Sequence, residues 1–220
     1  MQKPVASPAV AAEERRSADR ALLFERAALG LAHEGKNPLH NMMLHLQLMS
    51  EKLAGEGGPP VDRHVVAMRA GIGRVDSLLK AFGELAEPAH LPCDLGLAVT
   101  RALQLFNYEA RRSSVELQSA PASSLPVASN PAALNDLVAH ATLAAIALAR
   151  DGGRVLLQLD PQGARALLRF QVQGGAPRHA QAAPHLAALE RLAPEAPCEL
   201  SLDTSAGGEA RLSLSFPHPR

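Results

Sequence analysis

The segment His33-Glu34-Gly35-Lys36-Asn37-Pro38-Leu39 holds the residue types and spacing best suited to chemistry. An imidazole beside a carboxylate is a workable nucleophile, because the carboxylate can accept the proton of one ring nitrogen and leave the other free to attack phosphorus. Asn37 follows His33 by one helical turn on the same face, where its amide can orient a water. A zinc-protease helix is excluded, because it needs a second histidine where Asn37 stands. The pattern is typical of a nucleophilic imidazole able to attack phosphorus, with Asn37 able to orient a water for hydrolysis.

The helix that carries His33 must present it to solvent. The apolar residues downstream are spaced three and four apart, which is a heptad seam: Leu39, Met42, Leu46, Met49 and Leu53. Extending the seam upstream places Ala32 and Gly35 on the buried stripe, so His33 should face outward. Pro38 cannot donate to the carbonyl of Glu34, and we expect the helix to bend just below the histidine.

A second seam follows the helix-breaking run Gly55–Pro60. Its members are Val61, Val65, Met68, Ile72, Val75, Leu79 and Phe82. Residues 1–12 are then a loose tail, and residues 13–87 form an antiparallel helical hairpin. Because a lone hairpin leaves both apolar stripes exposed to solvent, we expect a homodimer in which two hairpins form a four-helix bundle.

The second half predicts a small α+β layer over residues 95–220, after a linker at 88–94. Asp94 and Asn130-Pro131 are helix-start signals. We expect helices at Leu95 to about Arg112, Pro131 to about Arg150 and about Pro184 to Leu192. We expect strands at Val115–Ser119, Leu125–Ala128, Arg154–Asp160, Arg165–Gln173, Glu199–Asp203 and Ala210–Phe216, the last pair joined by a turn at Gly207-Gly208.

The composition excludes several classes of protein. Lys+Arg and Asp+Glu are both 22 in 220 residues, and aromatic residues are 3%, which argues against a nucleic-acid partner. The two cysteines, Cys93 and Cys198, lie far apart and are typical of free thiols in a reducing compartment. No segment reaches the roughly 18 uninterrupted apolar residues of a membrane helix, and the first residues lack an apolar core long enough for a signal peptide. We therefore expect a cytoplasmic protein without membrane insertion.

His33-Glu34-x-x-Asn37-Pro38-Leu39 on a hairpin helix resembles the dimerisation and phosphoacceptor domain of two-component sensor histidine kinases. Arg74 and the stretch Ser77–Phe82 resemble the partner helix of that domain. The order of elements after Asp94 resembles the ATP-binding domain of the same family, so that the resemblance covers about Leu22 to Pro217. It implies that His33 is phosphorylated, that Glu34 assists phosphotransfer, and that Asn37 occupies the position linked to phosphatase activity.

The ATP-binding half departs from the family pattern. The two asparagines that the family uses to hold magnesium correspond to His140 and Ala144, and Ala144 has no oxygen for a metal. The loop that contacts adenine corresponds to Phe170–Pro177, which contains no acid, and the glycine-rich phosphate loop is missing between Gln173 and Pro184. We expect a domain that keeps its fold without nucleotide chemistry, with no cofactor and no metal. Asn135-Asp136 as a shifted metal pair is a weaker alternative, because it comes a turn or more too early.

These features together predict a histidine phosphotransfer protein. It would exchange a phosphoryl group between His33 and the aspartate of a response-regulator receiver domain, with receiver phosphatase activity as a variant. Lys36, His40 and Leu44 are the predicted partner-binding residues, the last two on the same helical face as His33. His40 and His45 do not share a face, which argues against a metal site there.

Three alternatives remain open at this point. They are an ATP-dependent sensor histidine kinase, a non-enzymatic receiver-binding adaptor, and an ordinary coiled-coil hairpin with a surface histidine. The pair Arg111-Arg112 is interpreted as a solvated helix end beside its own C-terminal dipole.

Overall fold

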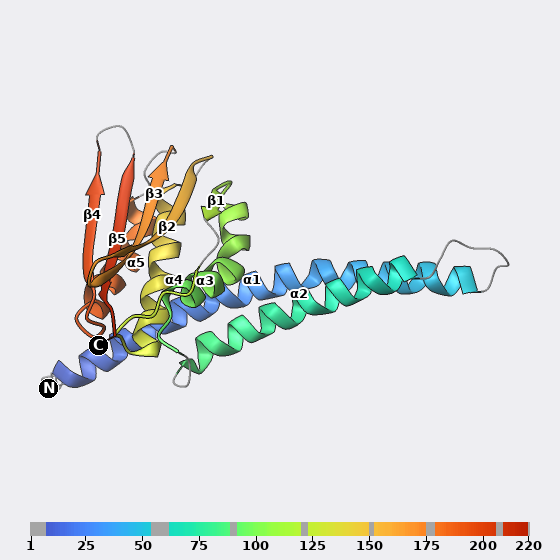
Figure 1. The fold of residues 1–220 in the computed structure, drawn as a ribbon, viewed down its shortest axis with the longest axis horizontal. Coiled ribbons are helices and arrows are strands. Elements are labelled where there is room, and N and C mark those ends of the chain that lie inside the picture. Colours follow the sequence, from blue (N-terminus) through green and yellow to red (C-terminus); the bar gives the residue numbers. More distant parts are fainter. Residues whose placement is uncertain are drawn as a thin grey trace, which may run out of the picture.

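Two long helices dominate the computed structural model, which describes residues 8–53, 62–88, 92–119, 123–149, 152–174, 179–205 and 209–219. Helices α1 (Pro8–Leu53) and α2 (Asp62–Ala86) lie side by side and antiparallel, which confirms the predicted hairpin (Figure 1). The predicted breaker at Gly55–Pro60 lies outside the described residues. Helix α1 begins earlier than predicted, at Pro8, because proline suits a first turn whose N–H groups have no helical partner.

The two helices of the hairpin approach closely at Gly71 of α2, which faces Met42 of α1. A Cβ atom on Gly71 would lie 2.6 Å from Cγ of Met42, so a larger residue here would require the Met42 side chain to shift. Gly35 is buried as predicted, but Ala32 is exposed, because a straight helix drifts away from a strict heptad over successive turns. The side chain of His33 is exposed, in agreement with the prediction.

Each seam leaves part of its stripe uncovered in a single chain. Four large apolar residues of the two seams are more than half exposed: Leu39 51%, Leu46 55%, Ile72 58% and Leu79 55%. Met43 and Val66 add further exposed apolar surface on the same two helices. The hairpin therefore has an apolar surface that its own α/β domain does not cover.

The second half is a five-stranded mixed sheet with helices, which confirms the predicted α+β class. The elements are α3 (Leu95–Arg112), β1 (Glu116–Ser119), α4 (Pro131–Leu148), β2 (Arg154–Gln162), β3 (Arg165–Gln173), α5 (His179–Leu192), β4 (Glu199–Thr204) and β5 (Ala210–Pro217). The strand order is β1-β2-β3-β5-β4, with β1 parallel to β2 and the other neighbours antiparallel. The helix caps at Asp94 and Asn130 are as predicted.

Two boundaries in this half were predicted wrongly. The segment Leu125–Ala128 is not a strand, because its pairing is limited to one isolated bridge between Asp94 and Pro126. Helix α5 begins at His179 and contains Pro184, which the prediction placed at its start. The predicted turn at Gly207-Gly208 lies outside the described residues.

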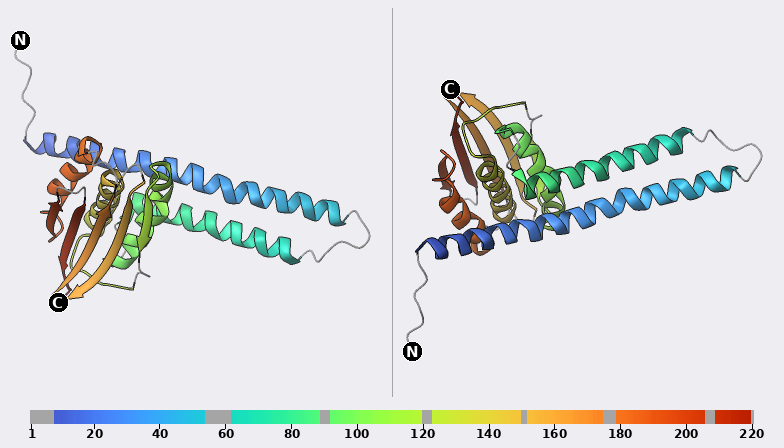
Figure 2. Two further views of the ribbon diagram at one scale, coloured as in Figure 1. Left: turned by 90° about the horizontal axis from the view of Figure 1, so that it is seen from above. Right: turned by 90° about the horizontal axis from the view of Figure 1, so that it is seen from below.

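Helix α4 is the centre of the domain. Of the described helices, it alone is long and apolar enough to cross a membrane, but 83% of it is buried inside the protein. It lies between the sheet and α1, with α3 and α5 beside it (Figure 2). Its apolar character is thus that of a core helix.

The domain is docked against the first half of α1. Leu23 and Ala27 of α1 are almost fully buried in the same core as α3 and α4. A side chain on Gly30 would collide with the carbonyl oxygen of Leu105 in α3, so this glycine permits the close approach of the two helices. The C-terminal half of α3 therefore lies alongside the turn of α1 that carries His33.

Ion pairs reinforce this docking along α1. Five pairs among the described residues join α1 to the domain, and three of these are Arg16–Glu195 at 2.5 Å, Asp19–Arg191 at 2.5 Å and Arg26–Glu109 at 3.6 Å. An exposed pair such as Arg16–Glu195 contributes little, about 0–1 kcal/mol, but all five pairs are consistent with one orientation of the domain on α1. The predicted hairpin and the predicted domain are thus packed together along α1.

Candidate functional site

The imidazole of His33 is stacked on the ring of Tyr108. The ring centroids are 4.0 Å apart and the planes differ by 4°, so that one face of the imidazole is covered by the phenol ring. Tyr108 lies near the end of α3 and belongs to the α/β domain. Because the lone pair of a ring nitrogen lies in the ring plane, stacking leaves the nitrogen at the ring edge available.

Glu34 points away from solvent toward α3. Its carboxylate forms an ion pair with the guanidinium of Arg111 and is 17% exposed. The prediction that Glu34 reaches the imidazole of His33 is not what the structure shows, because the helix directs this side chain toward the docked domain. The interpretation of Arg111 as a merely solvated helix end is corrected at the same time.

A pocket of about 490 Å³ opens beside His33. It is lined by His33, Lys36 and Asn37 of α1 and by Tyr108, Arg111 and Arg112 of α3. None of the six lining residues is acidic, and three are cationic. Asn37 thus shares the pocket with His33, about 6 Å further along the helix by its rise per residue.

The other predicted partner-binding residues lie further along α1. Both His40 and Leu44 are exposed, and Leu44 is 48% accessible. They lie on the helix beyond the pocket that His33, Lys36 and Asn37 line. The structure therefore places Lys36 beside His33, and His40 and Leu44 on the adjoining open surface of the hairpin.

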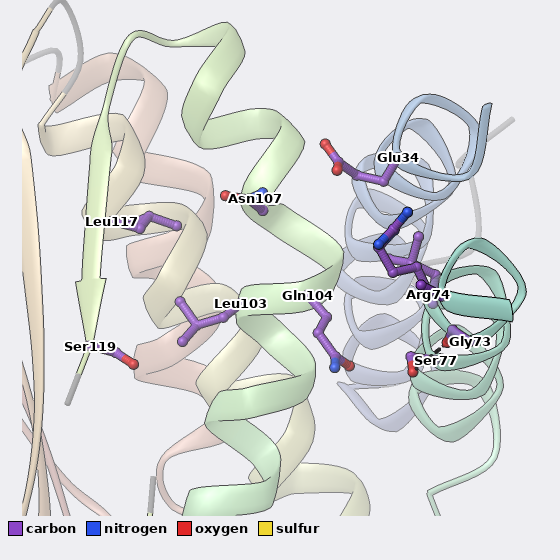
Figure 3. A pocket seen from close by; sticks show the side chains of 11 residues that line it. Glu34, Gly73, Arg74, Ser77, Leu103, Gln104, Asn107, Leu117 and Ser119 are labelled. Carbon is purple, nitrogen blue, oxygen red and sulfur yellow. Dashed lines mark hydrogen bonds between the residues drawn. The ribbon is translucent and has the colours of Figure 1, made fainter. Parts of the chain in front are cut away.

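A second cavity, of about 630 Å³, separates α2 from α3 and β1 (Figure 3). Glu34 and Arg74 lie on the hairpin side, and Leu103 and Leu117 lie on the domain side. Near His33 the domain therefore contacts the hairpin through α1, with open space between α3 and α2.

Helix α4 carries structural contacts where the resembled family holds its metal. His140 is fully buried, and its Nδ1 lies 3.1 Å from Nδ1 of His185 in α5. One ring must donate to the other at this distance, which requires at least one neutral ring. Ala144 is also fully buried in the core. Both positions are therefore filled by packing between α4 and its neighbours.

Burial keeps the two histidines neutral. Burial, with His185 and the positive charge of Arg191 acting in the same direction, lowers the pKa of His140 to about 3. Burial likewise lowers the pKa of His185 to about 4, with Arg26 acting in the same direction and Glu109 and Asp19 opposing it. Both imidazole rings are therefore uncharged near neutral pH.

Asn135 and Asp136 are also engaged in structural contacts. The Asn135 amide donates to the carbonyl of Pro131, and its oxygen accepts from Arg101. Asp136 is buried 3.9 Å from Nε of Arg20, and burial raises the pKa of this carboxyl to about 6. Within the described ranges no group of three or more metal-ligating side chains occurs, and Cys93 and Cys198 are free thiols.

Tyr108 and Arg111 are the site residues that the sequence did not reveal. They follow His33 by 75 and 78 residues, with a second helix between, and no spacing rule connects them. Two features bear on them: Tyr108 is the only tyrosine of the chain, and Gly30 permits a close helix crossing next to the motif. Only the docking of α3 on α1 brings these residues to His33.

No protein-family model matches the chain, and no curated protein matches it. Among solved structures, one described as a bacterial phosphotransferase is 17% identical, with a TM-score of 0.49 over 97% of this chain and 100% of that one. A mycobacterial sensor histidine kinase, MprB, is 18% identical, with a TM-score of 0.47 over 59% of this chain and 99% of that one. The Acinetobacter baumannii histidine kinase AdeS is 13% identical, with a TM-score of 0.46 over 86% and 98%.

The kinases among these structures belong to the family that the His33 motif resembles. With TM-scores below one half and identities of 18% or less, the likenesses assign no activity to this chain. The roles of its residues must come from the site itself.

Proposed function

We propose that this chain is a cytoplasmic, dimeric histidine phosphotransfer protein that exchanges a phosphoryl group between His33 and an aspartate on a response-regulator receiver domain. The observation that carries the proposal is an exposed imidazole in a pocket with three cationic residues and no acidic one. Such a pocket suits an anionic group presented to the ring edge. Asn37 in the same pocket is placed to hold a water for hydrolysis.

The transfer step needs only groups that the two proteins supply. The unprotonated ring nitrogen of His33 attacks phosphorus, and the N–P bond forms as the P–O bond to the receiver aspartate breaks. The electron pair of that bond returns to the aspartate carboxylate. The other ring nitrogen keeps its proton during the attack and gives it to water afterwards; the reverse reaction takes the same path.

The buried contacts of α4 favour this proposal over an ATP-dependent kinase. His140 bonds to His185, and Ala144 packs in the core, at the two positions that the resemblance assigns to metal-holding asparagines. The packing of α1 against α3 and α4 holds the domain in one place. A kinase domain must instead move to bring its bound nucleotide to the histidine, so this packing also favours the proposal. We therefore propose that the domain acts without bound nucleotide.

The exposed apolar residues of the hairpin support a homodimer. Leu39, Leu46, Ile72 and Leu79 would become buried between two hairpins, and each fully buried leucine or isoleucine contributes about 1.5–3 kcal/mol. A second copy at this face would form the four-helix bundle predicted from the seams.

The decisive experiment mixes the full chain with phosphorylated receiver domains and measures acid-labile phosphate on the protein. We expect transfer to wild type and to Asn37→Ala, and none to His33→Gln, which should keep its fold because an exposed side chain carries little packing energy. Asn37→Ala should retain the receiver phosphate longer than wild type does. Phosphate that persists on His33→Gln would show that another histidine is the acceptor, and His218→Gln, at a histidine outside the hairpin, is the matched control.

A further inference from the structure

The docked domain contributes half of the residues that line the pocket around His33. Tyr108, Arg111 and Arg112 come from the end of α3, and Lys36 comes from α1. We propose that the α/β domain completes a phosphoryl-binding site at His33. In this site Arg111 binds the phosphoryl oxygens together with Lys36 and Arg112, and Tyr108 is the positioning residue for the imidazole. The inference rests on the proposed phosphotransfer function and deepens it.

Charge is the first reason for the assignment. A phosphoryl group on nitrogen carries close to two negative charges, and the pocket offers three cationic side chains. Arg111 is already oriented by its ion pair with Glu34, and Arg112 by a 3.1 Å contact with Glu109. A guanidinium has five N–H donors, so Arg111 can keep Glu34 and still donate to phosphoryl oxygens. Lys36 forms no ion pair with any residue that the structure describes.

The stacked ring is the second reason. As the imidazole attacks phosphorus, its ring gains positive charge, because the other nitrogen still holds its proton. The π face of Tyr108, 4.0 Å away and parallel, is electron-rich and stabilises a cationic ring more than a neutral one. The same contact limits rotation of the imidazole, so that its nitrogen stays directed along the pocket. The phenol hydroxyl takes no part in this stacking, so a phenylalanine at position 108 should serve as well as the tyrosine.

The site must then accept a phosphoryl group without a receiver. Phosphoramidate is a suitable small probe: the N–P bond to His33 forms, the N–P bond of the donor breaks, and ammonia leaves with the electron pair. The experiment treats the full-length protein with phosphoramidate and follows His33 phosphorylation by intact mass, with His33→Gln as the blank. A wild-type His33 that stays unmodified would overturn the assignment, whatever receivers do.

Variants separate the two roles. Arg111→Gln should slow phosphorylation by about tenfold or more, from the loss of a hydrogen bond to a charged group. Arg154→Gln is the matched control, because Arg154 is similarly exposed, 52% against 55%, and also pairs with a glutamate. Tyr108→Leu should be about two- to fivefold slower than Tyr108→Phe, which should match wild type.

A spectroscopic readout distinguishes positioning from a general structural effect. The ring protons of His33 should be shifted upfield by the stacked ring in wild type and Tyr108→Phe, and not in Tyr108→Leu. Wild-type rates for both Arg111→Gln and Tyr108→Leu would overturn the inference, and transfer from a receiver to His33 would then still support the proposed function. If His33 reacts with phosphoramidate but not with phosphorylated receivers, the phosphoryl-binding site would stand and the proposed exchange with receivers would fall.

Discussion

The buried His140–His185 pair predicts a loss of stability in acid that one substitution should largely remove. Their Nδ1 atoms are 3.1 Å apart, and the residues are 0% and 6% exposed. Burial lowers the pKa of His140 from 6.5 to about 3 and that of His185 to about 4. Because each folded pKa lies below the unfolded value, the unfolded chain binds more protons, and stability falls as the pH drops below 6.5.

The magnitude follows from these values. A pH of 5 lies about 1.5 units below the pKa of each histidine in the unfolded chain. Protonation of the unfolded chain therefore lowers the free energy of unfolding by about 2 kcal/mol per ring relative to pH 7.5. Asp136 acts in the opposite direction, because burial raises its pKa from 3.8 to about 6 and its protonation in the folded state restores about 1.4 kcal/mol. These three groups together should lower the free energy of unfolding by about 2–3 kcal/mol between pH 7.5 and pH 5.

The assay is urea unfolding followed by circular dichroism at both pH values. His185→Gln keeps a hydrogen-bonding side chain opposite His140 and removes one titrating group, so its loss should be smaller than that of wild type by about 2 kcal/mol. Other carboxylates titrate alike in both chains and cancel in the difference. His40→Gln, at an exposed position, should behave as wild type does. An equal loss in His185→Gln and wild type would refute the reasoning.

Three further predictions concern assembly, docking and nucleotide. The double variant Leu46→Glu and Leu79→Glu should be monomeric in light scattering at micromolar concentration, since both side chains are 55% exposed in the single chain; a persistent dimer would place the interface elsewhere. Gly30→Ala should force α3 away from α1 at the Leu105 carbonyl, lower the free energy of unfolding by about 1–3 kcal/mol, and abolish the upfield shift of the His33 ring protons, whereas Gly73→Ala, which meets open space, should not. Mg-ATP should show no binding in calorimetry, because Ala144 offers no metal ligand; a low-micromolar Kd would contradict this.

The hairpin, the helix caps and the sheet strands could be predicted because they depend on local patterns. The seams through Leu46 and Leu79, the cap at Asp94 and the alternation in β3 and β5 are each encoded within a few residues of one another. The wrongly predicted strand has a cause that is not local. The segment Leu125–Ala128 has strand-like residues but pairs only through one bridge, and pairing depends on a neighbour that the segment itself does not specify.

The sequence by itself determined which residue is the candidate acceptor, because the types and spacing of His33, Glu34 and Asn37 lie within two turns of one helix. The surroundings of that acceptor were decided by tertiary structure alone. Glu34 faces Arg111, and His33 stacks on Tyr108, because Gly30 lets α3 pack against α1. Contacts between residues so far apart depend on how two surfaces fit together, and no periodicity within either helix records that fit.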